Sequence, residues 1–187
     1  MTRATVGVYG GSFDPPHMGH VLSVSWALSA AGLDEVWAVP TWQHVFDKAI
    51  QASFEQRVQM CELAFGQCRG ASVLEIEREL GGPSRSLDTL VALRRRHPSV
   101  QFRLIVGADI LPSTDRWHRW DEIARQAPPL VIGREGYPHP EGCPISIPIV
   151  NSTEIRAAHA RGQDVAGLVP DRVLDFIRAG RLYRDPG

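Results

Sequence analysis

Apolar positions along this chain recur with two different periods, and the alternation of these periods predicts strands and helices in turn. Short apolar runs predict buried strands, and they lie at Val6–Tyr9, Val36–Val39, Ser72–Ile76, Phe102–Val106, Leu130–Ile132 and Ile145–Val150. Helical patterns begin at His17, Ser53, Ser86, Ser152 and Pro170. Strands that alternate with helices favour an α/β fold, namely a doubly wound parallel sheet with helices on both faces. The last two predicted helices form a small helical extension at the C-terminus.

The first of these helices has a broad apolar face and a clear end. It is expected to run from His17 to Gly32. The positions expected to share its buried face are Val21, Leu22, Val24, Ala27, Leu28 and Ala31. The last helix should begin at Pro170, as proline favours the first position of a helix. Its expected core positions are Val173, Leu174 and Ile177.

Length and composition fit one globular domain. The 187 residues are enough for a single domain over 1–187, with its helical C-terminal part at about 152–187. Hydrophobic residues make up 43% of the chain and charged residues 22%, so extensive disorder is not expected. The net charge of −1 argues against nucleic-acid binding through bulk positive charge. Small anionic substrates need only local positive charge and therefore stay possible.

Cysteine usage and apolar runs suggest a reduced, cytoplasmic protein. Three cysteines do not make a disulfide framework. Cys61 and Cys68 fall on one predicted helix, about 10 Å apart, which is too far for a disulfide. No signal peptide is visible at the N-terminus. The longest apolar stretch, Val21–Leu33, is too short to span a bilayer, so no membrane association is expected.

The segment between the first strand and the first helix carries the strongest chemical signal. It is Gly10-Gly11-Ser12-Phe13-Asp14-Pro15-Pro16-His17-Met18-Gly19-His20. Glycines allow the backbone to approach a ligand closely, and the N-terminus of the following helix attracts phosphate. His17 and His20 project from one side of the first turn and can donate hydrogen bonds to phosphate as charge develops. Gly19 between them leaves room for a flat base or a ribose.

Other kinds of site fit this segment less well. No Gly-Lys-Ser/Thr follows the glycines, so it is not a Walker A loop, and it lacks the GxGxxG order of dinucleotide-binding enzymes. His17 and His20 could ligate a metal, but no further ligand cluster stands out, so no protein-bound metal site is predicted. Two ordinary surface histidines are disfavoured by the complete string placed after a strand.

Two further segments are expected at the same edge of the sheet. Ser152-Thr153-Glu154-Ile155-Arg156 predicts an N-cap followed by a cation one turn later, both able to hold phosphates. The alternative is a capped helix with an exposed arginine. Asp109 follows the fourth strand, where it can accept hydrogen bonds from a ribose or cap the next helix, and neither role is preferred. Asp14 is expected to cap or stiffen its own loop.

Taken together, these segments resemble the HxGH nucleotidyltransferase superfamily. Its members have a Rossmann-like fold and join a nucleoside monophosphate to an acceptor phosphate, releasing pyrophosphate. Its second signature is often Ile-Ser-Ser-Thr-x-Ile-Arg, from which Val150 and Asn151 depart. The resemblance implies catalytic roles for His17, His20 and Arg156 at the phosphates of ATP. It also implies an ATP site that comprises Gly10, Gly11, Ser12, Phe13, Gly19, Asp109, Ser152 and Thr153.

Within that superfamily, the chain resembles bacterial nicotinate mononucleotide adenylyltransferases. Pro83-Ser84-Arg85-Ser86-Leu87-Asp88-Thr89-Leu90 is similar to their Pro-Ser-Tyr-Thr-x-Asp-Thr-Leu, and Asp115-Arg116-Trp117-His118-Arg119-Trp120 to the segment whose tryptophan stacks on the pyridine ring. The resemblance implies an acceptor site with Trp117 as the stacking ring and main-chain donors near Ser86 and His118. Arg85 replaces the usual Tyr and would pair with the acceptor carboxylate or be exposed. Trp120 is expected in the core.

One loop departs from that family. Thr41–Lys48 lacks the Pro-Pro-His-Lys that usually follows the second strand, and His44 and Lys48 are expected to take over the contact with the acceptor phosphate. An exposed loop is an equal alternative. Trp42 and Phe46 could instead line a pocket for another acceptor.

The resulting hypothesis is in-line transfer of AMP from ATP to nicotinate mononucleotide, which gives deamido-NAD and pyrophosphate. Mg²⁺ is expected to bridge the phosphates of ATP rather than to sit in a protein cage. The expected partners are thus ATP and a mononucleotide. The alternatives are an HxGH enzyme that uses nicotinamide mononucleotide, phosphopantetheine or an alcohol phosphate, and a catalytically silent nucleotide-binding relative.

Overall fold

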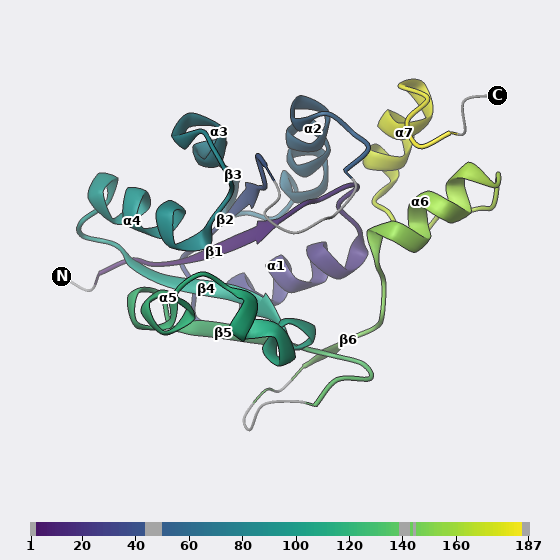
Figure 1. The fold of residues 1–187 in the computed structure, drawn as a ribbon. Helices are drawn as coiled ribbons and strands as arrows, with labels where there is room; N and C mark the ends of the chain where they lie inside the picture. The colour runs from purple at the N-terminus through teal and green to yellow at the C-terminus, as the bar shows by residue number, and fades with distance from the viewer. Residues whose placement is uncertain (1–2, 44–49, 139–142, 144, 185–187) are drawn as a thin grey trace.

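Six parallel strands form the centre of the molecule. The computed structural model describes residues 3–43, 50–138, 143 and 145–184. The strands are β1 (Thr5–Gly11), β2 (Glu35–Pro40), β3 (Ala71–Val73), β4 (Gln101–Gly107), β5 (Pro129–Arg134) and β6 (Ser146–Ile147). Their order in the sheet is β3-β2-β1-β4-β5-β6, and every pairing is parallel. The sheet predicted from the alternating pattern is confirmed (Figure 1).

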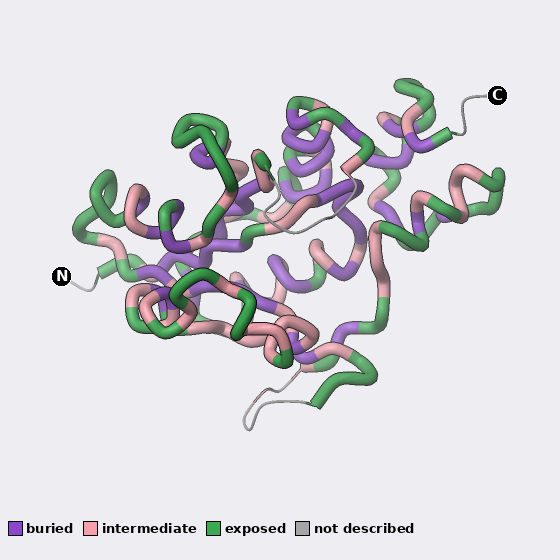
Figure 2. The backbone as a smooth tube through the Cα atoms, viewed as in Figure 1, coloured by how far each residue is buried: buried purple, intermediate pink, exposed green. Residues whose placement is uncertain are grey.

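Helices cover both faces of this sheet. They are α1 (Met18–Ala30), α2 (Phe54–Phe65), α3 (Ile76–Leu80), α4 (Ser86–Arg96), the 3₁₀ segment η1 (Ala108–Arg116), α5 (Trp120–Gln126), α6 (Ser152–Ala160) and α7 (Asp171–Ala179). One apolar core joins the sheet to α1, α2, α6 and α7, and a second core joins its other face to α4 and α5. Figure 2 shows the buried positions concentrated along the sheet and the inner sides of the helices.

Neighbouring positions of the central strands face different cores, as the two-residue period of a strand requires. Val8 belongs to the core with α4 and α5, whereas Tyr9 belongs to the core with α1 and α2. On β4, Leu104 and Ile105 divide in the same way. Because both faces of these strands are buried, consecutive residues have to be apolar. The resulting apolar runs made the strands predictable from the sequence.

The connections from β1 and β4 leave the sheet on opposite faces. The strand order reverses between these neighbours, because β1 leads through α1 to β2 on one side while β4 leads through η1 and α5 to β5 on the other. In such sheets, ligands bind beyond the carboxyl ends of the strands at this reversal. The end of β1 is Gly10-Gly11 and the end of β4 is Gly107, so both predicted loops meet there.

Short elements depart from the sequence-based expectation. The third strand ends at Val73 rather than Ile76, since Ile76 begins α3, and the sixth strand contains only Ser146 and Ile147. Neither α3, η1 nor α5 was predicted. They are one to three turns long, and Pro112 lies inside η1, so no sustained 3.6-residue period marks them.

Three local predictions need correction. Leu22 is 44% exposed, so it does not belong to the buried face of α1, and the buried neighbour is Ser23, whose hydroxyl donates to the Gly19 carbonyl. Cys68 lies beyond the end of α2, and all three cysteines are free. The N-cap of α6 is Asn151 rather than Ser152, because the Asn151 side chain accepts the Glu154 N–H at 2.8 Å.

Other helix ends agree with expectation. Ser53 caps α2 through its bond from the Gln56 N–H, and Pro170 precedes α7, whose Val173, Leu174 and Ile177 are buried. Gly32, just past the end of α1, has the positive φ of +71° that favours glycine there. Within the described ranges, no helix is long and apolar enough to cross a membrane.

Candidate active site

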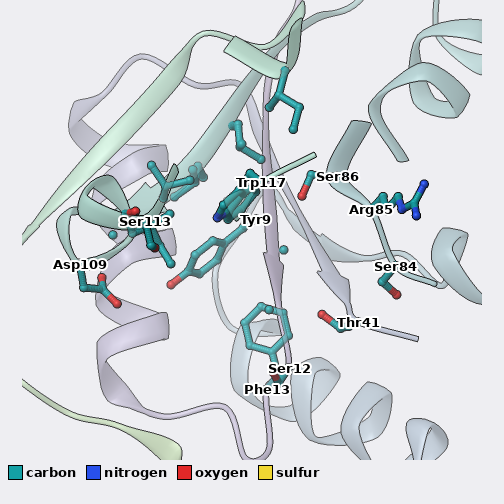
Figure 3. A pocket seen from close by; sticks show the side chains of 18 of the residues that line it. Tyr9, Ser12, Phe13, Thr41, Ser84, Arg85, Ser86, Asp109, Ser113 and Trp117 are labelled. Carbon is teal, nitrogen blue, oxygen red and sulfur yellow. Dashed lines mark hydrogen bonds between the residues drawn. The ribbon is translucent and has the colours of Figure 1, made fainter. Parts of the chain in front are cut away.

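A cavity of about 810 Å³ lies at the carboxyl ends of β1 and β4, the place predicted from the strand order. Its volume suits a small-molecule site. Among the residues predicted for the site, those that line it are Gly10, Gly11, Ser12, Phe13, His20, Arg85, Ser86, Asp109, Trp117, His118 and Ser152. Figure 3 shows Tyr9 and Trp117 in the middle of this group, between the side of Asp109 and the side of Ser84 and Ser86. Segments predicted separately for ATP and for an acceptor thus share one cavity.

His20 is the histidine of the loop that reaches the cavity. Its Nδ1 accepts a hydrogen bond from the His17 N–H at 3.1 Å, so a neutral His20 carries its proton on Nε2 and can donate from there. The Phe13 ring meets the His20 ring edge-on at 5.0 Å and the Tyr9 ring does so at 5.9 Å. These contacts hold the imidazole in one orientation at the cavity wall.

His17 lies beneath His20 rather than beside it. It is 2% exposed, is the N-cap residue of α1, and stacks on His20 with ring centroids 3.7 Å apart. It does not line the cavity. Gly19 does not line it either: a Cβ there would come within 3.1 Å of the His17 ring. Gly19 therefore leaves space for the buried imidazole, whereas the sequence had suggested space for a base or ribose.

Arg156 also lies outside the cavity lining in this structure. Its Nη1 donates to the Asp14 carbonyl at 2.6 Å and lies 3.7 Å from the Asp14 carboxylate. Ser152, one turn earlier on α6, does line the cavity, and its hydroxyl donates to the Pro15 carbonyl at 2.9 Å. Thr153 is exposed and does not line the cavity. The two segments predicted to bind phosphate thus lie against each other through the backbone oxygens of residues 14 and 15.

Three buried donor groups near this junction have no hydrogen-bond partner among the described residues. They are the Ser12 hydroxyl, the Arg57 Nε and the Arg156 Nε. A buried polar group without a partner costs roughly 1–3 kcal/mol, so such groups in a native protein call for an explanation.

Arg57 joins the two halves of the site from below. It is 2% exposed, and its guanidinium donates to the Ser12 carbonyl at 2.8 Å and to the Thr41 carbonyl at 2.7 Å. The Thr41 N–H in turn donates to the Gly11 carbonyl at 2.9 Å. Burial lowers the pKa of Arg57, but arginine stays charged in proteins. A fixed positive charge therefore lies under the loop that contains Ser12.

The side of the cavity that was predicted to bind the acceptor is built around the start of α4. Ser84, Arg85 and Ser86 line it, and Arg85 is exposed, with its side chain turned away from Tyr9 and Trp117 in Figure 3. The Ser84 hydroxyl accepts the Trp42 N–H at 3.0 Å. As α4 begins at Ser86, the first N–H groups of this helix are available as donors at the cavity rim.

Glu77, which the sequence did not single out, organises this side. Its carboxylate accepts the Trp42 N–H at 3.1 Å and the Thr89 hydroxyl at 3.2 Å, and it lines the cavity. Burial raises the pKa of Glu77, and hydrogen bonds from Ser84, Trp42 and Thr89 partly oppose that rise. Glu77 therefore links α3 to both the segment after β2 and α4.

Trp117 lies at the cavity, whereas Trp120, which was expected in the core, is only partly buried. Trp117 lines it and meets Trp120 edge-on, with ring centroids 5.5 Å apart, while Trp120 does not line it. Both rings pack partly against the core with α4 and α5. His118 is exposed at the rim. His44 and Lys48 lie outside the described residues, and Trp42 packs edge-on against Phe54 at 4.9 Å.

Asp109 pairs with Arg134 across the ends of β4 and β5. Asp109 Oδ1 lies 3.1 Å from Arg134 Nε, and both side chains line the cavity. The N-cap of η1 is Gly107, with no side-chain cap, so the predicted alternative that Asp109 caps the next helix is wrong. Arg134 was not predicted from the sequence as a site residue. It lies at the carboxyl end of a strand, β5, which is the same feature that pointed to Asp109.

The other cavity residues that were missed carry weaker signals. Tyr9 is the last apolar position of β1, and burial raises its pKa, so its hydroxyl keeps its proton at neutral pH. Ser113 and Arg116 lie on η1, a segment that no helical repeat of apolar residues marks in the sequence. Thr41 directly follows β2. The described residues contain no group of three or more His, Cys, Asp or Glu placed to hold a metal ion.

Comparison with known proteins points to one family. Residues 8–158 match the family model described as cytidylyltransferase-like. A probable nicotinate-nucleotide adenylyltransferase of Anaeromyxobacter dehalogenans is 47% identical over 96% of both chains. The nicotinate-nucleotide adenylyltransferase of Bacillus subtilis is 32% identical over 95% of this chain and 97% of its own. Each of these relatives covers nearly the full length, so the similarity is not limited to the loop.

A solved structure supports the fold. The nicotinic acid mononucleotide adenylyltransferase of Plasmodium falciparum, determined in complex with NaAD, superimposes with a TM-score of 0.81 at 18% identity. The match covers 96% of this chain and 97% of that one. At this identity, the likeness concerns the fold, and it includes the doubly wound arrangement described above.

Proposed function

The chain belongs to the nicotinate-nucleotide adenylyltransferase family, and from this membership we propose that it transfers AMP from ATP to nicotinate mononucleotide. The products are deamido-NAD, a precursor of NAD, and pyrophosphate. The observation that carries the proposal is the single cavity in which His20 and Ser152 face the same space as Ser86 and Trp117. A phosphate-binding half and a ring-binding half thus share one compartment, as a two-substrate transfer requires.

The reaction is an in-line displacement at the α-phosphorus of ATP. An oxygen of the acceptor phosphate forms the new P–O bond while the bond to the leaving pyrophosphate breaks. A phosphate monoester is already nucleophilic at neutral pH, so no residue has to remove a proton. Catalysis then depends on positioning and on stabilising negative charge.

The residues divide these tasks by their place. His20 donates to the phosphate that develops charge, with His17 holding its ring from below. Ser12 and Arg156 bind the triphosphate, and the Ser12 hydroxyl and the Arg156 Nε have no hydrogen-bond partner among the described residues. Trp117 stacks on the pyridine ring, and the N–H groups at the start of α4 meet its carboxylate. Asp109 accepts hydrogen bonds from a ribose, with Arg134 fixing its position.

Mg²⁺ belongs to this proposal as a companion of ATP. Magnesium ions commonly keep several water ligands and bind to substrate phosphates with one or two carboxylates. No cage of three or more ligating side chains occurs among the described residues, so the triphosphate and water would supply most of the ligands. Bound there, the ion would neutralise the charge on the departing pyrophosphate.

Pyrophosphate release tests the proposal directly. The purified chain is supplied with ATP and Mg²⁺, and nicotinate mononucleotide, nicotinamide mononucleotide and phosphopantetheine are offered separately. We expect turnover with the first and at least tenfold lower kcat/KM with the amide, because a carboxylate gains charge-assisted hydrogen bonds that an amide does not. Turnover of phosphopantetheine alone would move the enzyme to another acceptor class, and ATP binding without any turnover would mean a silent relative.

A further inference from the structure

The start of α4, which lies at the cavity rim, is not held by its own N-cap residue. That residue is Arg85, and its side chain makes no capping hydrogen bond. Arg85 and Ser86 both line the cavity, so the uncapped opening of the helix lies where a ligand can reach it. Because a capping side chain normally stabilises a helix start, other contacts have to fix the position of this one.

Glu77 supplies one such contact from α3. It is 9% exposed, and its Oε1 accepts the hydroxyl of Thr89 at 3.2 Å. Thr89 is 3% exposed, lies one turn into α4 and does not line the cavity. Its hydroxyl also lies 3.3 Å from the Arg85 carbonyl, in the opening turn of the helix. A residue of the cavity lining is thereby joined to that turn through a side chain outside the lining.

The other oxygen of the same carboxylate holds the segment after β2. Glu77 Oε2 accepts the Trp42 N–H at 3.1 Å, and the Ser84 hydroxyl accepts the same N–H at 3.0 Å. Ser84 is joined to this segment twice more: its hydroxyl accepts the Gln43 N–H at 3.0 Å, and its own N–H donates to the Gln43 carbonyl at 2.8 Å. The Glu77 carboxylate therefore has one oxygen on each of two segments that meet at this part of the cavity.

A carboxylate is a costly way to fill a buried position. Desolvation disfavours its charged form and raises the pKa of Glu77. Replacing buried charges by apolar side chains of similar volume is often neutral or stabilising. An apolar side chain cannot, however, hold an N–H donor of one segment and an O–H donor of another at a fixed separation. The position of Glu77 is thus explained by the two segments that it joins.

We propose that Glu77 and Thr89 are positioning residues for the acceptor: the hydrogen bond between them sets the first N–H groups of α4 where they bind a carboxylate on the pyridine ring. The bond thereby strengthens the preference for the acid over the amide. The inference rests on the proposed function, in which these N–H groups meet the carboxylate of nicotinate mononucleotide. It assigns a part in specificity to Thr89, a residue outside the cavity lining.

Thr89 allows a test that leaves the cavity lining unchanged. Thr89→Val removes the hydroxyl and nearly keeps the volume, whereas Thr89→Ser keeps the hydroxyl and removes a methyl group. The dissociation constants of nicotinate mononucleotide and nicotinamide mononucleotide are measured by calorimetric titration with a non-hydrolysable ATP analogue present. We expect Thr89→Val to lower the ratio of the amide constant to the acid constant about fivefold, since the acid depends more on charge-assisted hydrogen bonds. Thr89→Ser should keep this ratio within about twofold.

Substitutions of Glu77 separate its hydrogen bonds from its charge. Glu77→Leu removes both and should lower the ratio as Thr89→Val does. Glu77→Gln keeps an oxygen for the Trp42 N–H and presents an amide N–H to the Thr89 hydroxyl. That hydroxyl can then donate to the Arg85 carbonyl, so the ratio should stay within about twofold of the unsubstituted enzyme. If Glu77 acted on the acceptor through its charge, it would repel the acid, and both variants would raise the ratio.

Val91→Ala is the matched control for a general weakening of α4. Val91 packs against the same core from α4, and its substitution removes apolar contacts but no side-chain hydrogen bond. We expect the ratio of dissociation constants to stay unchanged in this variant. If Glu77→Leu does not fold, the comparison of Thr89→Val with Thr89→Ser decides alone.

Four results would overturn the inference. They are an unchanged ratio in folded Thr89→Val, an equal fall in Thr89→Val and Thr89→Ser, a fall of the same size in Val91→Ala, and a rise in Glu77→Gln. The titrations involve no transfer of AMP. Failure of this inference is therefore distinguishable from failure of the proposed function, which would appear as absent turnover of nicotinate mononucleotide by the unsubstituted enzyme.

Discussion

At the scale of single residues, the two histidines of the loop show how like side chains acquire different tasks. His20 lies at the cavity wall with its ring fixed by His17 and Phe13, while His17 is buried under it. Their spacing in the sequence suggested two equivalent phosphate ligands. In the structure only His20 lines the cavity, and His17 supports its ring, because His17 caps the helix and His20 lies one turn in.

His20→Ala should therefore impair the chemical step rather than binding. Loss of a donor that acts on charge developing in the transition state costs roughly 10²–10³ in kcat. We expect the dissociation constant of a non-hydrolysable ATP analogue to change less than about threefold. Steady-state pyrophosphate release and calorimetric titration measure the two quantities. Equal losses in kcat and in affinity would contradict a transition-state role for His20.

At the scale of elements, two adjacent residues at the start of α6 are expected to have different roles, one in helix stability and the other in ligand binding. Asn151 caps the helix through the Glu154 N–H, while Ser152 lines the cavity and donates to Pro15. We expect Asn151→Ala to lower the free energy of unfolding by about 1 kcal/mol with little change in kcat. Ser152→Ala should leave stability nearer the original and weaken ATP binding. Denaturant unfolding and analogue titration check both, and the reverse assignment of effects would show that Ser152 is the cap.

The short helix α3 gives a pH-dependent prediction. Burial raises the pKa of Glu77 above its ordinary 4.5, so the folded state holds this proton more tightly than the unfolded state. The free energy of unfolding contributed by Glu77 therefore falls as pH rises from about 4.5 through the raised value. Glu77→Gln should flatten the fall measured by denaturant unfolding across that range. Glu79→Gln, on the same helix but exposed and paired with Arg96, is the control that should keep the original slope.

At the scale of the whole molecule, the features that could be predicted from the sequence are those determined by residues close together in the chain. The long apolar runs of β1 and β4 and the complete loop from Gly10 to His20 allowed the sheet, and a loop that lines the cavity, to be predicted. Elements of one to three turns, such as α3, carry no such period. The contacts of Asp14 and Arg57 join residues far apart in the chain, and no local pattern indicates which backbone oxygens or hydroxyls they will meet.

Arg57 provides the prediction that concerns both halves of the site at once. Its two terminal nitrogens donate to the carbonyls of Ser12, on the proposed ATP side, and Thr41, next to the proposed acceptor side. A lysine has a single ammonium group and cannot reproduce this fork. Arg57→Lys should therefore raise the KM for ATP and for nicotinate mononucleotide together, by roughly tenfold each, as one lost hydrogen bond to a charged group allows.

That joint effect distinguishes Arg57 from residues that serve one substrate. Trp117→Ala should raise the KM of the acceptor alone, because the proposed function gives its ring to the pyridine of the acceptor, and Ser152→Ala should affect ATP alone. The exposed Arg69→Lys controls for the loss of a guanidinium elsewhere and should change neither constant. A rise confined to one substrate in Arg57→Lys would mean that the two loops are positioned independently. A joint rise would mean that the buried cation sets the distance between the phosphate of the acceptor and the α-phosphorus it attacks.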